Sequence, residues 1–199
     1  MGVKKNFTLV FIISTLRLFG QDEFLSDKNG LLFGYQQGLG YYAPLDYAVG
    51  TGFHLKNGLS VGFGFQQFEE LFIPVGSIGY LGKQKQGKNI VSPGAGITYG
   101  YTEDYHLFAL NIEVYRCFYP ESGFPFVLGG LFSLESGWDI KKEQFLNLVP
   151  LVRLNYYQAF FQNKVAYPLI GISGIYALNE QMGFMIIIAG LNVKLGSNK

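Results

Sequence analysis

Residues 45–65 read LDYAVGTGFHLKNGLSVGFGF, and this stretch decides the fold class. In residues 45–55 the odd positions are large and mostly apolar, whereas the even positions are small or polar. Residues 59–65 repeat the pattern after Asn57 and Gly58. Alternation with period two is typical of β-strands, and an Asn-Gly pair between two such runs predicts a hairpin.

The same alternation recurs along the chain and predicts about ten strands. They run near residues 30–41, 44–56, 59–68, 71–83, 89–101, 105–118, 123–135, 145–160, 164–178 and 182–196. Most exceed the roughly nine to eleven residues that a tilted membrane strand needs. Large apolar faces opposite small or polar faces fit a lipid-facing wall around a hydrated lumen. We therefore expect an all-β, antiparallel up-and-down transmembrane β-barrel of about ten strands, with eight as the alternative if two segments are loops.

Composition agrees with a surface that does not face water. Only 15% of residues are charged and 49% are hydrophobic, whereas soluble domains carry about 25% charged residues. Residues 1–20 have the pattern of a secretory signal peptide: Lys4 and Lys5 precede an apolar core at 7–16. We expect the mature barrel domain to span residues 21–199. Removing three of the 15 basic residues leaves 12 against 14 acidic ones, which disfavours nucleic-acid binding.

Connections between the strands would alternate between the two sides of a membrane. An even strand count places both termini on the periplasmic side. The longest connection, Ser136–Gln144, would then face outside and carry the single tryptophan, Trp138. Longer charged loops outside and short turns inside match membrane barrels.

Aromatic residues gather near the ends of the predicted strands, as in the interfacial girdles of membrane barrels. The expected outer girdle comprises Tyr41, Tyr42, Tyr47, Tyr99, Tyr101 and Tyr105, and the inner one Tyr80, Tyr115, Phe118, Phe124, Tyr156 and Tyr167.

Prolines argue against the barrel, because a closed sheet has no edge strand to hold them. Five fall inside predicted strands: Pro74, Pro93, Pro125, Pro150 and Pro168. Pro150 is the most central and predicts a bulge.

Candidate chemistry is sparse. Glu113 and Arg153 fall on lumen faces at similar depth with one strand between them, and His54 and Lys56 fall on the lumen face of another strand. We expect a lumen charge network with a structural role, since an unpaired charge in a narrow interior is costly. A lone Cys117 permits no internal disulfide and no paired-cysteine metal site. No catalytic, cofactor or metal motif occurs, so an enzyme is not expected.

The chain resembles the small outer-membrane β-barrel family of Gram-negative envelopes over about residues 30–196. The resemblance is carried by Phe72-Ile73-Pro74-Val75, by the Ile90–Gly96 segment after a basic turn and by repeated Gly-x-Gly strands. The last strand ends Gly190-Leu191-Asn192-Val193-Lys194-Leu195, which is similar to the insertion signal of such barrels, although Ile188 and the non-aromatic C-terminus depart from it. The resemblance implies outer-membrane location, with outer-membrane lipid and the barrel-assembly machinery as partners.

Three functional hypotheses follow from this sequence. The first is an integral barrel with a packed lumen and a structural or surface-interaction role, for which an extracellular ligand is possible but unidentified. The second is a narrow pore for small solutes. The third is an exported soluble calyx that binds a hydrophobic ligand.

Overall fold

A single antiparallel sheet closes on itself in the computed structural model, which describes residues 29–39, 47–68, 71–160, 165–179 and 181–195. The predicted signal peptide at 1–20 and the predicted start of the mature domain at residue 21 lie outside these residues. Ten strands form the barrel: β1 (Asn29–Leu39), β2 (Tyr47–His54), β3 (Leu59–Phe68), β4 (Leu71–Leu81), β6 (Asn89–Tyr101), β7 (Tyr105–Phe118), β8 (Phe126–Asp139), β10 (Val149–Ala159), β11 (Ala166–Ala177) and β12 (Met182–Leu195). Two short strands, β5 (Gln84–Gln86) and β9 (Gln144–Phe145), prolong hairpins.

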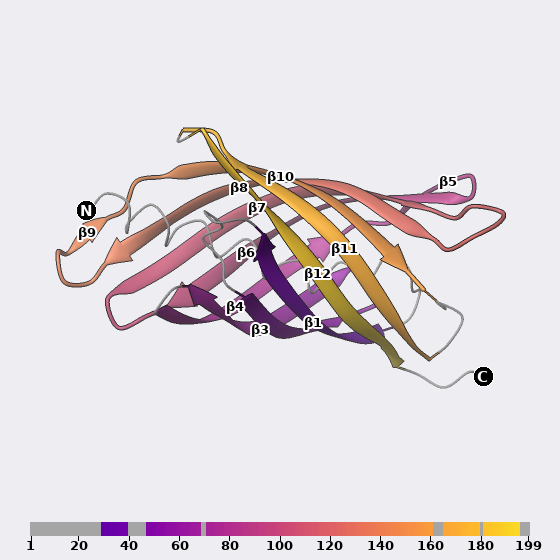
Figure 1. Ribbon diagram of the computed structural model, residues 1–199, viewed down its shortest axis with the longest axis horizontal. Coiled ribbons are helices and arrows are strands. Elements are labelled where there is room, and N and C mark those ends of the chain that lie inside the picture. The colour runs from indigo at the N-terminus through magenta and orange to yellow at the C-terminus, as the bar shows by residue number, and fades with distance from the viewer. Residues whose placement is uncertain (1–28, 40–46, 69–70, 161–164, 180, 196–199) are drawn as a thin grey trace.

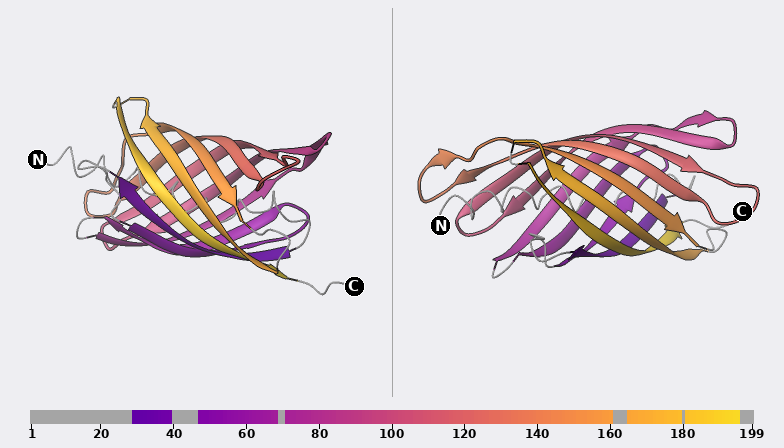
Figure 2. Two further views of the ribbon diagram at one scale, coloured as in Figure 1. Left: turned by 45° about the vertical axis from the view of Figure 1, so that its right-hand side comes forward. Right: turned by 45° about the horizontal axis from the view of Figure 1, so that its top comes forward.

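The first and last strands close the barrel. Each strand pairs with its neighbour along the chain, and β1 pairs with β12 from Asn29 opposite Leu195 to Leu39 opposite Met185. The strands tilt steeply around a shared interior (Figure 1; Figure 2). The prediction of an all-β up-and-down barrel with ten strands is confirmed. We call the end where β1 begins and β12 ends the terminal end, and the opposite end the far end.

Among the residues described, the secondary structure includes no helix that is both long and apolar enough to span a membrane.

The loop predicted at Ser136–Gln144 is mostly strand. Residues Ser136–Asp139 continue β8, and β9 pairs back onto them, with Trp138 opposite Phe145. The turn itself shrinks to residues 140–143. Between the barrel strands β8 and β10, the connection still covers 140–148 with β9 inside it, and it is longer than the terminal-end connections 82–88 and 119–125. These two are in turn longer than 102–104 at the far end, so the expected contrast between long outer loops and short inner turns holds for the longest connection and not for every one.

The bulge predicted at Pro150 lies just before it. Phe145 pairs with Trp138 and Val149 pairs with Glu135. Residues 146–148 therefore span the length that residues 136–137 occupy on β8. From Val149 onward the pairing with β8 is continuous, including Pro150 opposite Leu134. Alternation alone predicts that Leu146 and Leu148 both face outward; the extra residue turns Leu146 inward, where it is buried, whereas Leu148 is exposed as predicted.

Each proline within a strand lies one position outside a ladder with one of its neighbours. Pairing of β4 with β6 stops at Val75, next to Pro74, and pairing of β6 with β4 stops at Gly94, next to Pro93. The β10–β11 ladder runs from Leu151 to Ala159 on β10 and ends at Leu169 on β11. Pro150 and Pro168 sit immediately beyond it, and Pro125 precedes β8. A missing N–H therefore leaves the ladders intact, which removes the objection to a closed sheet.

The Asn57-Gly58 hairpin forms, with a different turn from the two-residue type that this pair favours. Gly58 N–H donates to the Leu55 carbonyl at 2.9 Å, which centres the turn on Lys56 and Asn57. Gly58 alone in this turn has a positive φ, of 99°. A Cβ there would lie 2.3 Å from the Leu81 carbonyl oxygen, so glycine is required twice over.

The aromatic girdles are only partly correct. Tyr47, Tyr80, Tyr99, Tyr101, Phe124 and Tyr156 are exposed on the outer wall. Tyr115 and Tyr167 are fully buried and point inward, because they fall on the inward parity of β7 and β11. Tyr41 and Tyr42 lie outside the described residues.

Inward glycines pair directly with large inward side chains on neighbouring strands. Tyr115 is opposite Gly129, and a Cβ on that glycine would lie 1.9 Å from the Tyr115 ring. Tyr157 covers Gly171 in the same way, with 2.5 Å between such a Cβ and the ring. The same arrangement recurs in the pairs His54–Gly30, Leu81–Gly94 and Leu107–Gly137. Covering a glycine with a large cross-strand side chain restores the packing that the strand lacks there.

We predict that Gly129→Ala lowers the free energy of unfolding by about 1–3 kcal/mol, because the new methyl group displaces the Tyr115 ring. Gly174→Ala is the matched control, since a Cβ at that strand position has nothing within 4 Å. Urea unfolding in detergent micelles, followed by the gel mobility of the folded band, measures both. Equal midpoints for the two variants would contradict the packing described here.

Candidate functional site

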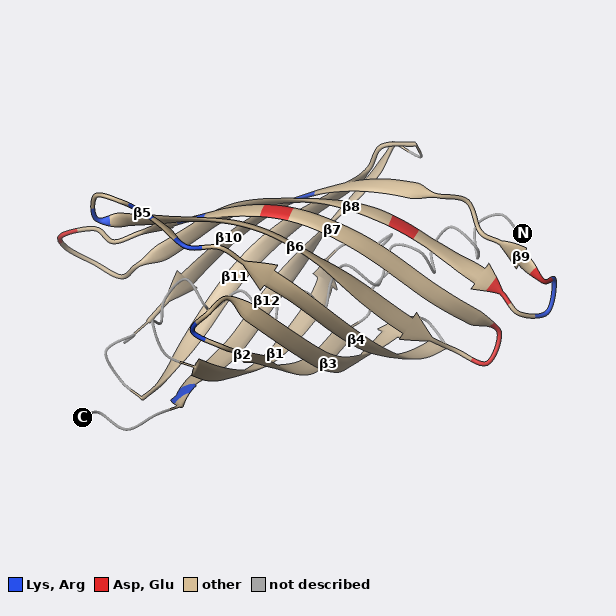
Figure 3. Ribbon diagram, turned by 180° about the vertical axis from the view of Figure 1, so that it is seen from behind, with Lys and Arg blue, Asp and Glu red and all other residues tan. Residues whose placement is uncertain are grey.

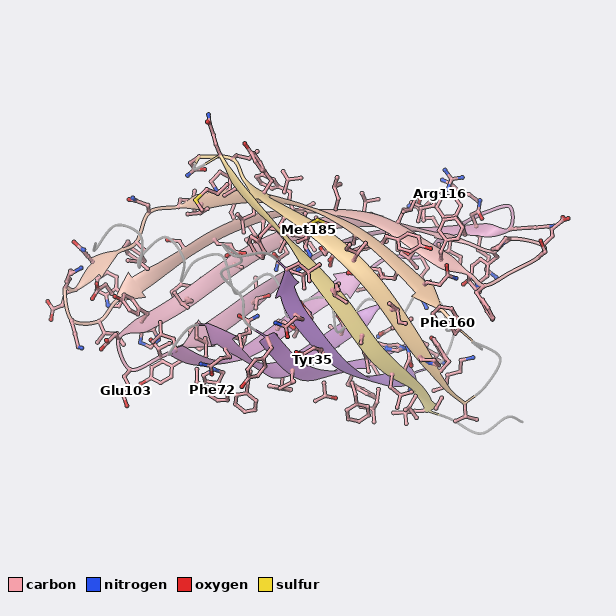
Figure 4. The ribbon with its side chains drawn as sticks, in the orientation of Figure 1. Tyr35, Phe72, Glu103, Arg116, Phe160 and Met185 are labelled. Carbon is pink, nitrogen blue, oxygen red and sulfur yellow. The ribbon has the colours of Figure 1, made fainter. Side chains whose placement is uncertain are left out.

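The outer wall of the barrel is a continuous apolar surface. Phe63, Ile112 and Leu154 are 64%, 59% and 67% exposed, and Phe72 projects from the wall in Figure 4. Of the outward positions described in the ten barrel strands, only Arg116 carries a charge. His106 also falls on an outward position, and the Tyr99 hydroxyl lies 2.6 Å from its Nδ1. Water would be a poor solvent for this wall.

The inner wall carries the opposite chemistry. Its polar and charged side chains are nearly all inaccessible, and one of them, Arg153, is among the largest fully buried residues. The buried polar residues of the barrel strands are Gln36, His54, Ser60, Gln66, Ser92, Thr98, Asn111, Glu113, Ser133, Glu135, Asp139, Arg153, Asn155, Ser173 and Asn192. Apolar outside and polar inside is the inverse of a water-soluble domain.

Arg153 is the centre of a hydrogen-bonded group on β10 and β11. Its Nε donates to Asn155 Oδ1 at 2.9 Å and to Ser173 Oγ at 2.6 Å. Ser173 Oγ in turn donates to Asn155 Oδ1 at 2.7 Å. Alternation places Arg153 and Asn155 on the same face of β10, and the ladder puts Ser173 opposite Asn155. These three side chains therefore fix the guanidinium against the wall.

Two carboxylates enter the same region from β7 and β8. The Tyr115 hydroxyl donates to Glu113 Oε2 at 3.1 Å, and the Ser133 hydroxyl donates to Glu135 Oε1 at 3.3 Å. Glu113 and Arg153 are both paired with Leu131 of β8, from its two sides, so they lie at one level of the barrel. We call Glu113, Tyr115, Ser133, Glu135, Arg153, Asn155 and Ser173 the lumen cluster.

His54 and Lys56 do not join the lumen cluster. His54 is buried near the terminal end on β2, with three strands between β2 and β10. Its ring lies over Gly30, where a Cβ would be 2.3 Å from His54 Cε1. Lys56 is exposed, and the prediction that it faces the lumen is wrong. Strand β2 ends at His54, so the alternation no longer governs Lys56, which is a central residue of the turn.

Five members of the lumen cluster were missing from the predicted lumen network: Tyr115, Ser133, Glu135, Asn155 and Ser173. Glu135 stood at the predicted end of its strand, although continued alternation through Ser133, Glu135 and Gly137 would have marked it as inward. Ser173 became recognisable only with the β10–β11 register, which brings it opposite Asn155. Burial is high for both side chains.

Within the described residues, no group of three or more histidine, cysteine, aspartate or glutamate side chains is placed to hold a metal ion. Cys117 is a buried free thiol.

A row of glycines crosses the inner faces of four strands. Gly190, Gly34, Gly50 and Gly64 form this cross-strand row over β12, β1, β2 and β3. All four fall on the inward parity of their strands. Buried side chains adjoin the row on the same faces, among them Leu32, Gln36 and Asn192, so the inner wall lacks side chains only at the level of the row itself.

A closed barrel with an apolar exterior and a polar interior has the architecture of a transmembrane β-barrel. Among solved structures the chain is similar to Neisserial surface protein A (NspA), at 13% identity and a TM-score of 0.44, with 85% of this chain and 98% of that one covered. It is also similar to the NanC porin, at 9% identity and a TM-score of 0.46, with 84% and 100% covered. No family model and no curated protein matches the sequence.

We predict that Arg153→Met destabilises the folded barrel by about 3–5 kcal/mol, because it leaves two buried carboxylates without the one buried cation of the cluster. Ser173→Ala removes hydrogen bonds to the guanidinium and to Asn155 and is expected to cost about 2 kcal/mol. Ser92→Ala is the matched control, since the buried Ser92 hydroxyl has no hydrogen-bond partner among the described residues. Urea midpoints in micelles rank the variants, and a Ser173→Ala midpoint equal to that of Ser92→Ala would contradict the network.

Proposed function

We propose that the protein is an integral outer-membrane β-barrel whose interior is filled by a polar network. Its role is structural or in interaction at the envelope surface, without catalysis. The observation that carries the proposal is the inversion of polarity: one charged residue on the described outer wall, and three charged residues of the lumen cluster buried inside.

Membrane insertion accounts for the outer wall better than a soluble calyx does. A calyx would bury its large apolar side chains toward the ligand and leave polar ones outside. Here Phe63, Ile97, Ile112 and Leu154 are all more than half exposed. In water they would form a continuous aggregating surface, whereas in lipid they are in a matching solvent. Closure between β1 and β12 also leaves no unpaired strand edge in the hydrocarbon.

The lumen cluster favours a packed interior over an open pore. Hydrogen bonds join its side chains between β10 and β11 and between β10 and β7, where Asn155 Nδ2 reaches the Tyr115 hydroxyl at 3.5 Å. Tyr115 and Tyr157 add two inward rings, on β7 and β10. Inward side chains that contact one another in this way occupy space that an open water path would need. The narrow pore is therefore the second candidate, supported by the row of inward glycines on β12, β1, β2 and β3.

The orientation of the barrel in the membrane follows from the strand count. Ten strands place both termini of the chain, and with them the terminal end of the barrel, on the periplasmic side. The connections at the far end would then face outside and supply any surface interaction. The proposal includes an export signal at residues 1–20. It also includes two partners, outer-membrane lipid and the barrel-assembly machinery.

Membrane insertion is tested by expressing the full chain in a Gram-negative host and separating its membranes. We expect the protein in the outer-membrane fraction, with a gel band that shifts on boiling because the closed barrel resists detergent. Leu154→Asp, which puts a charge on the lipid-facing wall, should reduce the shifted fraction. Soluble periplasmic protein without any shift would refute membrane insertion and favour the calyx.

A packed interior predicts no steady conductance in planar bilayers. Removing Tyr115 and Arg153 together, as Tyr115→Ala with Arg153→Ala, should create open-channel steps, because both side chains project into the lumen. Leu154→Ala is the control: Leu154 lies on the lipid-facing side of β10, so this variant should show no steady conductance. Steady wild-type conductance would establish the narrow pore in place of the packed interior.

A further inference from the structure

Charge is distributed unequally between the two ends of the barrel (Figure 3). At the terminal end, the described residues include one acidic residue, Glu121, and a set of basic residues. That set comprises Lys56, Lys83, Lys85, Lys88, Arg116 and Lys194. At the far end the described acidic residues, Glu103, Asp104, Asp139 and Glu143, outnumber Lys141 and Lys142. Outside the described residues, the sequence that links β1 to β2 and β3 to β4 contains Asp46, Glu69 and Glu70. The sequence next to the strand ends of the terminal end contains three acidic residues, Asp22, Glu23 and Asp27, and three basic ones, Lys28, Lys164 and Lys199.

The basic groups at the two ends also differ in their partners. At the far end, Lys141 Nζ lies 2.7 Å from Asp104 Oδ1, and Lys142 Nζ lies 3.3 Å from Asp139 Oδ2. The hydrogen bond and the charge of Asp104 raise the pKa of Lys141. At the terminal end Lys88 pairs with Glu121. Among the described residues, no carboxylate pairs with Lys85 or Arg116. The terminal end therefore keeps cations available for an external anion.

Arg116 is placed where a lipid headgroup would meet the barrel. It is the single charged residue on the described outward positions of the barrel strands, two residues before the end of β7. Its guanidinium lies 5.0 Å from the centre of the Phe118 ring, which stacks on Phe126. Figure 4 shows Arg116 projecting from the wall close to the hairpin that holds β5. Val91 pairs with Arg116 on one side and with Gln84 of β5 on the other, so this hairpin extends beside Arg116.

We propose that the terminal end is a docking surface for anionic phospholipid headgroups, with Arg116 as its lipid-facing anchor and Lys85, which follows Gln84 in the adjoining β5 hairpin, as a second cation of the rim. An aromatic ring next to an unpaired guanidinium at the rim fits the interface, where the ring contacts the glycerol region and the cation contacts phosphate. The occupant is a phosphatidylglycerol-type lipid of the leaflet at this end. The inference rests on the proposed membrane insertion and adds a preferred lipid and a defined leaflet to it.

Fluorescence quenching by brominated lipids measures the lipid preference separately at each end of the barrel. Trp138, the single tryptophan, reports on the far end as it stands. Phe118→Trp combined with Trp138→Phe moves the reporter beside Arg116. Each protein is reconstituted in phosphatidylcholine vesicles with brominated phosphatidylglycerol or brominated phosphatidylcholine. The readout is the binding constant of phosphatidylglycerol relative to that of phosphatidylcholine. We expect a ratio severalfold above one at residue 118, with up to about fivefold for each basic residue within reach of the surface. At residue 138 we expect a ratio at or below one.

Two variants with equal charge loss separate this proposal from general electrostatics. Lys85→Gln with Arg116→Gln should bring the constant at residue 118 to about that of neutral lipid, as should high salt. Lys141→Gln with Lys142→Gln, at the far end, should leave it unchanged. Equal constants at both reporters, or equal effects of the two variants, would overturn the proposal. The boiling-dependent gel shift is recorded for every sample, so a protein that fails to insert refutes the membrane proposal rather than the lipid preference.

Discussion

Closure of the sheet between β1 and β12 is the constraint on which the rest of the structure depends. Without this ladder, two strands whose outer faces are apolar would each present a row of unpaired N–H and C=O groups. In water such an edge recruits other chains, and in lipid it cannot be satisfied at all. With the ladder in place, the backbone is paired around the whole barrel. The prolines follow the same constraint, since each of those within a strand lies just past the end of a ladder.

Closure also fixes how the interior is filled. Ten tilted strands leave a narrow space, and inward side chains must fit both their neighbours and the facing wall. The pairing of Tyr115 with Gly129 and of Tyr157 with Gly171 places each ring over the glycine of the neighbouring strand. The remaining polar groups then meet one another on β7, β8, β10 and β11. The lumen cluster is thus a consequence of strand order as much as of residue type.

Sequence reasoning was sufficient for the strand count, the strand order and most of the facing, because each depends on local alternation and on turn residues. It also placed Glu113 and Arg153 on lumen faces at similar depth, since depth follows from counting along two strands that flank a third. Two of the failures have a common physical origin. The extra residue at 146–148 and the central position of Lys56 in its turn depend on where a ladder starts or ends, which is not a property of one segment alone. Tyr115 is different, because the alternation that places Glu113 in the lumen also turns Tyr115 inward, and the girdle prediction did not apply it.

The charge asymmetry connects the barrel to its surroundings in a way that the fold does not require. Closure and packing would be served equally well by any distribution of lysine and glutamate at the rims. Yet the cations at the far end are neutralised by local carboxylates, whereas Arg116 stands on the apolar wall beside an aromatic ring with no carboxylate partner among the described residues. A guanidinium in that position is costly unless an anion reaches it from outside the protein. Within a bilayer the anion available at the height of the rim is the phosphate of a lipid headgroup, so the position of Arg116 is best explained by its lipid neighbour.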